Sequence, residues 1–217
     1  MSKTIDPARI KAHIRPKGTP FNITKIGHVV LNSSDLERSV RFYTEILGFK
    51  VSDVYTPDIA PGGMVFMRCN ADHHGVALVG SMPGTSPNIE LNHMAFEVGT
   101  LDEVFRARDH LKKHNIPIDF EGRRRAGVQI AVEFRDPDGH RLEIFWGLDQ
   151  VGSDGSIRPP EEWKWAHTLE DAVADPVRGQ DTTLQDKTLL RQRTPEEAKR
   201  ELEHSLATQN AKLAVRK

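Results

Sequence analysis

Cysteine is nearly missing from this sequence, which contains one, Cys69, among 217 residues. A single cysteine excludes a disulfide within the chain. No apolar run approaches the roughly 20 residues that cross a bilayer, and the first residues lack the apolar segment of a secretory signal. We therefore expect a cytoplasmic protein that has no membrane partner.

An excess of one charge is also lacking, because 30 lysines and arginines balance 31 aspartates and glutamates, giving a net charge of -1. This balance gives no general attraction to nucleic acid. Apolar residues make up a modest 37% of the chain, so we expect part of it to pack poorly. The composition changes along the chain and predicts three parts: an N-terminal arm (1–23), a central domain (24–147) and a polar, partly helical C-terminal extension (148–217).

Two features of the extension predict structure. Thr194 suits an N-cap, Pro195 suits the first helical position, and acidic residues follow in the first turn, which predicts a helix. Trp163 and Trp165 indicate that the extension docks onto the central domain or onto a second subunit.

The central region is an internal repeat with the order β-α-β-β-β in each copy. Periodicity and turn residues predict a module at 24–80 and a second at 90–147. In both copies a strand precedes an amphipathic helix, and three strands follow. They are expected near 49–55, 63–69 and 74–80 in the first copy, and near 116–122, 127–135 and 140–146 in the second.

Three residues of the repeat have metal-ligand chemistry. His28 and His93 occupy matching places in the first strands of the two modules, and Glu143 lies in the last strand. Counting residues places Leu78 at the position that matches Glu143, so no fourth protein ligand is evident. Two imidazoles and one carboxylate with open positions suit non-haem Fe(II), and the same donors suit Mn(II). Each histidine alone could also be an ordinary strand residue.

The segments GHVVLNSSDLERSVRFYTEILGF, LNHMAFEV and FRDPDGHRLEIFW resemble the vicinal oxygen chelate superfamily, which includes glyoxalase I, bleomycin-resistance proteins and type I extradiol ring-cleaving dioxygenases. The resemblance covers roughly 24–147 and implies an α+β fold. In this fold two tandem βαβββ modules form a curved mixed sheet around a metal cavity. It also implies a homo-oligomer, a dimer or larger.

The segment MVFMRCNADHHGVALVG is similar to the part of extradiol dioxygenases that ends in an acid/base histidine, and His74 matches that residue. An imidazole titrates near neutral pH and can transfer the protons of a catechol. Glu133 stands where the family usually has a tyrosine that contacts the substrate. Arg123, Arg124 and Arg125 lie just upstream and either offset Glu133, bind an acidic substrate or form a solvated turn.

These features together predict an extradiol-type dioxygenase that cleaves a catecholic aromatic substrate with O2. We expect Fe(II) as cofactor and His74 and Glu133 as catalytic residues. Two alternatives stay open. One is a glyoxalase-like isomerase or lyase, which would normally add a fourth protein ligand near Leu78, and the other is a metal-free small-molecule binding or resistance protein.

Overall fold

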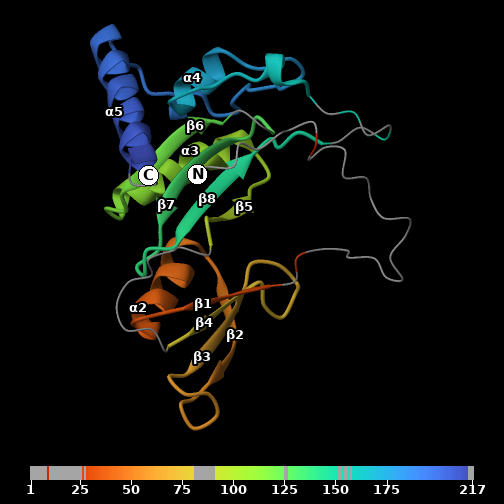
Figure 1. The fold of residues 1–217 in the computed structure, drawn as a ribbon, viewed down its shortest axis with the longest axis vertical. Helices are drawn as coiled ribbons and strands as arrows, with labels where there is room; N and C mark the ends of the chain where they lie inside the picture. Colours follow the sequence, from red (N-terminus) through yellow and green to blue (C-terminus); the bar gives the residue numbers. More distant parts are fainter. Residues whose placement is uncertain are drawn as a thin grey trace.

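The computed structural model describes residues 9, 26, 28–80, 91–124, 127–150, 153, 156 and 158–214. These residues form two modules and a C-terminal extension (Figure 1). Almost all of the N-terminal arm predicted at 1–23 lies outside them. No helix among the described residues is both long and apolar enough to cross a membrane.

The first module is a four-stranded mixed sheet with the order β1-β4-β3-β2. β1 and β4 are parallel, and the other pairs are antiparallel. Asp35 caps the module's helix by accepting a hydrogen bond from the backbone of Arg38 at 3.0 Å. The elements are β1 (Val29–Asn32), α2 (Leu36–Arg41) continued by the π-helix η1 (Phe42–Ile46), β2 (Lys50–Tyr55), β3 (Met64–Arg68) and β4 (Val76–Val79).

The second module repeats this arrangement with the strand order β5-β8-β7-β6. Thr100 and Glu103 form a capping box at the start of its helix, which packs its apolar side on the sheet. The elements are β5 (Met94–Glu97), α3 (Leu101–Lys113), β6 (Ile118–Arg123), β7 (Ile130–Arg135) and β8 (Arg141–Trp146). The predicted tandem βαβββ modules are confirmed, although each module has a sheet of its own.

The modules are joined by Asp138, which lies in the turn between β7 and β8. Its buried carboxylate accepts hydrogen bonds from the hydroxyls of Ser33 (2.8 Å), Ser34 (2.6 Å) and Ser39, all in the first module. Burial favours the neutral acid, yet these hydrogen bonds outweigh burial and lower the pKa of Asp138. This carboxylate therefore fixes the two modules at their junction.

The C-terminal extension folds back onto the outer edge of the second sheet (Figure 1). Ala166 pairs with Arg123 of β6 in an antiparallel bridge, and α4 (Leu169–Ala174) packs beside β6. The short helices η2 (Pro160–Glu162) and η3 (Lys187–Leu189) flank α4. The last described element is α5 (Pro195–Ala214), whose first turn is capped by Thr194 as predicted.

Candidate metal centre

Helix α3 covers one face of the second sheet, the face that carries Leu142 and Ile144 of β8. Because side chains alternate along a strand, Glu143 points to the opposite face. On that face Glu143 pairs with Ala95 of β5 and Glu133 of β7, and His93 precedes Ala95 by two residues. The ladder thus places His93, Glu143 and Glu133 on one face.

Glu143 is the most unusual group on this face. Its residue is 3% exposed, and its Oε1 has no hydrogen-bond partner among the described residues. Its other oxygen, Oε2, lies 3.4 Å from His93 Nε2. Burial raises the pKa of the Glu143 carboxyl and the charge of Glu133 raises it further, whereas His93, the Gln129 side chain and Arg124 lower it. A buried, half-satisfied carboxylate beside an imidazole has the donor chemistry that a divalent cation requires.

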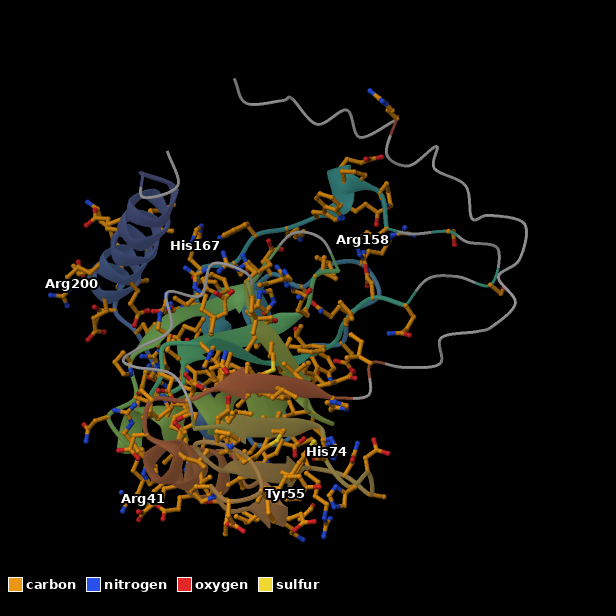
Figure 2. All side chains as sticks on the ribbon, turned by 60° about the horizontal axis from the view of Figure 1, so that its bottom comes forward. Arg41, Tyr55, His74, Arg158, His167 and Arg200 are labelled. Atoms are coloured by element: carbon orange, nitrogen blue, oxygen red, sulfur yellow. The ribbon has the colours of Figure 1, made fainter. Side chains whose placement is uncertain are left out.

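The other two predicted histidines lie on the first module. The rings of His28 and His74 are 4.5 Å apart, and the ring of Phe66 is 5.0 Å from that of His74. His74 Nδ1 lies 3.0 Å from His73 Nδ1. Loss of solvent contact lowers the pKa of the His74 imidazole, and the nearby His28 and His73 lower it further. Figure 2 shows His74 beside the strands of the first module.

The predicted donors therefore form two pairs, His28 with His74 and His93 with Glu143. Within the described ranges no group of three His, Cys, Asp or Glu residues is arranged to hold an ion. The complete triad of His28, His93 and Glu143 stays a prediction. The pair of His93 and Glu143 is the part of the triad whose geometry fits a cation.

Strand pairing corrects one detail of the sequence argument. Val29 pairs with Val76 in the first module, and Met94 pairs with Leu142 in the second. The residue equivalent to Glu143 is therefore Ala77, one position before the Leu78 that counting residues indicated. The shift arises because the two modules differ in length between the first and the last strand. Ala77 carries no donor atom, so its position adds no ligand.

Glu133 is held in an ion pair, which its place in the sequence did not reveal. Arg124 Nε and Nη2 both donate to Glu133 Oε1, at 2.7 and 2.5 Å. Arg124 thus offsets Glu133, as one of the sequence alternatives proposed. Arg123 is instead fully buried and donates to backbone carbonyls of the extension, including Lys164 O at 3.1 Å. Arg125 lies outside the described residues.

Trp165 of the extension completes this side of the site. Its ring meets the ring of Phe120 at 6.2 Å, edge to face, which confirms docking of the extension onto the domain. The guanidinium carbon of Arg124 lies 3.8 Å from the ring centre of Phe120 and 5.3 Å from that of Trp165. The paired tryptophans indicated docking in the sequence, but only the folded structure shows that Trp165 reaches Arg124.

Comparison with known proteins identifies the family of these modules. Residues 25–144 match the model of the Glyoxalase/Bleomycin resistance protein/Dioxygenase superfamily. A 3-methylcatechol 2,3-dioxygenase of Pseudomonas putida is 30% identical over 149 residues, 67% of this chain and 50% of that protein. An iron-dependent extradiol dioxygenase of Rhodococcus jostii is 29% identical over 148 residues, which cover 64% of this chain and 46% of that dioxygenase. A 1,2-dihydroxynaphthalene dioxygenase of Sphingobium xenophagum is 31% identical over 128 residues, covering 56% of this chain and 41% of that protein.

The chain spans about half the length of these curated relatives. With more than half of its residues matched by the family model, the chain belongs to the glyoxalase/bleomycin resistance protein/dioxygenase superfamily.

Proposed function

We propose that this chain is an Fe(II)-dependent extradiol-type dioxygenase that cleaves a catecholic aromatic substrate with O2. The observation that carries the proposal is the buried Glu143 carboxylate, which has an unpartnered oxygen and lies 3.4 Å from His93. Relatives with this family's domain that are named catechol, dihydroxynaphthalene and iron-dependent extradiol dioxygenases support the same activity.

The ligands that we assign to the ion are His28, His93 and Glu143. Bound Fe(II) would supply a template for the diol and O2 and stabilise the charge of the deprotonated diol. Ala77, at the place equivalent to Glu143, is fully buried and has no donor atom, so the first module adds no carboxylate. Three protein ligands leave open positions for substrate, and a glyoxalase-type site with four ligands is disfavoured.

His74 is the residue that we assign to proton transfer. A catechol must lose protons when it binds a cation, and an imidazole, which titrates near neutral pH, can accept one. Its Nδ1 already faces His73, so we assign the transfer to Nε2. Phe66, edge to face with His74, forms an apolar wall beside it.

A test combines metal analysis and turnover on one sample. The protein is purified without oxygen, its iron, manganese and zinc contents are measured, and O2 uptake with a panel of catechols is recorded with the ring-cleavage product. We expect iron and a coloured product from at least one catechol. Full activity with Zn(II) and no O2 consumption would refute the proposal.

A matched pair of variants locates the ligand. His93→Ala should lose the metal, whereas His114→Ala, which changes an exposed histidine after α3, should keep it. Binding of aromatic ligands retained by metal-free His93→Ala would instead favour a metal-free binding protein.

A further inference from the structure

Arg124 lies at the centre of a chain of contacts that links the C-terminal extension to the candidate metal centre. Its guanidinium group lies against the ring of Phe120 and near that of Trp165, and both of its donating nitrogens reach Glu133 Oε1. An arginine that stacks on aromatic rings loses little freedom when its planar group pairs with a carboxylate. These rings therefore hold Arg124 in the orientation that pairs it with Glu133.

Glu133 lies next to the group that we assign as a metal ligand. It pairs directly with Glu143 across β7 and β8, so both carboxylates point to the face opposite α3. The charge of Glu133 is close enough to raise the pKa of Glu143. Glu133 is thus a second carboxylate beside the position of any ion held by His93 and Glu143.

The extension is fixed where Trp165 meets Arg124. Ala166 forms its bridge with Arg123, whose buried side chain donates to the carbonyls of Lys164 (3.1 Å) and Ala172 (3.1 Å). Trp165 Nε1 donates to His167 Nδ1 at 3.0 Å, which sets the orientation of the indole ring. Figure 2 shows His167 with the extension above the second sheet. These contacts therefore hold the Trp165 side chain in one orientation.

We propose that the C-terminal extension is part of the metal site and acts through Arg124, which keeps the Glu133 carboxylate away from the ion. The inference rests on the proposed function. A carboxylate beside an ion with open positions is itself a good ligand. Without Arg124, Glu133 can turn toward the ion and take a position that the diol needs. Arg124 and Trp165 are thus positioning residues. The ion pair of Arg124 with Glu133 keeps a coordination position of the ion open for substrate.

The test is a double-mutant cycle on the full chain, with Mn(II) alone as the probe. Calorimetry gives the Mn(II) affinity, and steady-state kinetics of the Fe(II) form separate KM from kcat. Arg124→Gln should bind Mn(II) about tenfold more tightly and raise KM for the catechol, because Glu133 adds a ligand. Arg124→Gln combined with Glu133→Gln should return both values to those of the single variant Glu133→Gln.

Variants of the extension test the link to Trp165. Trp165→Leu should shift Mn(II) affinity and KM in the same direction as Arg124→Gln, and Trp165→Phe should restore them because a ring is retained. The matched control is Arg178→Gln, at an exposed arginine of the extension that pairs with Glu162 at 2.8 Å. It should change neither the Mn(II) affinity nor KM.

The outcomes separate this inference from the proposed function. If wild type binds Mn(II) through His93 and Glu143 but the cycle shows no coupling between Arg124 and Glu133, the inference is overturned and the proposed function stands. If Mn(II) does not bind wild type at all, both are overturned. Circular dichroism of each variant checks that it folds. If Arg124→Gln fails to fold, Trp165→Leu measured against Trp165→Phe carries the comparison.

Discussion

Glu170 of α4 fastens the C-terminal extension to the second module, and its removal should have a measurable cost in stability. Its buried carboxylate accepts hydrogen bonds from Arg108 Nη1 at 2.7 Å and from Arg191 Nε at 3.1 Å. Arg108 comes from α3 and is fully buried. Glu170→Gln removes the negative charge and leaves a buried guanidinium group with one fewer anionic partner.

The size of the effect follows from the pKa of Glu170. Burial alone would raise this pKa, but the hydrogen bonds and charges of Arg191 and Arg108 outweigh burial and lower it from 4.5 to about 2. A tenfold change in proton affinity corresponds to about 1.4 kcal/mol, so the interaction contributes about 3 kcal/mol at pH 7. Because the folded pKa lies below the unfolded one, this contribution is complete above about pH 5 and is lost as the pH falls toward 2.

Urea unfolding followed by tryptophan fluorescence, at pH 7, 5 and 3, measures the difference between wild type and Glu170→Gln. We expect a loss of about 3 kcal/mol at pH 7 and about half of that at pH 3. Glu161→Gln, at an exposed glutamate of the same extension, should change stability little at any of these pH values. A difference at Glu170 that stays constant from pH 7 to pH 3 would refute the reasoning, because the pKa would then not be lowered by folding.

Three further predictions concern the junction and the site. Asp138→Asn should lower the free energy of unfolding by about 2 to 4 kcal/mol in urea at pH 7, because buried serine hydroxyls lose a charged acceptor. A loss below about 0.5 kcal/mol, the range of a neutral surface change, would contradict the role of Asp138 at the junction. Glu143→Ala should abolish bound iron, and iron stoichiometry equal to that of wild type would remove Glu143 from the site. His74→Ala should keep the metal while kcat falls about 100-fold or more, the usual scale for loss of general acid–base catalysis. An unchanged kcat would remove His74 from the mechanism.

The elements were predictable from the sequence because their signals are local. The helix of the second module has a capping box at Thr100, α5 has its N-cap at Thr194, and the strands alternate in hydrophobicity. Each of these signals involves residues only a few positions apart. The repeat followed from them, because two copies of one pattern predict two copies of one module.

The contacts that join distant segments were not predictable in this way. The composition of residues 136–139 predicts a turn, but it does not indicate that Asp138 meets Ser33 and Ser39, about a hundred positions earlier. Likewise, the resemblance to extradiol dioxygenases placed Glu133 near the site and left its partner open among three arginines. The side-chain hydrogen bonds of the folded chain identify Arg124 as that partner. Counting residues also misplaced the equivalent of Glu143 by one position, because the two modules differ in length.

The arrangement of the predicted donors gives the junction between the modules a functional meaning. His28 and His74 belong to the first module, whereas His93 and Glu143 belong to the second. An ion bound by His28 together with His93 and Glu143 must therefore bridge the two modules. The hydrogen bonds of Asp138 fix how the modules lie relative to each other, so they also limit how closely the donor pairs can approach. Under the proposed function, Asp138 contributes to metal affinity without touching the ion. It holds the two modules, and with them the two donor pairs, in a relative position that metal binding would otherwise have to impose.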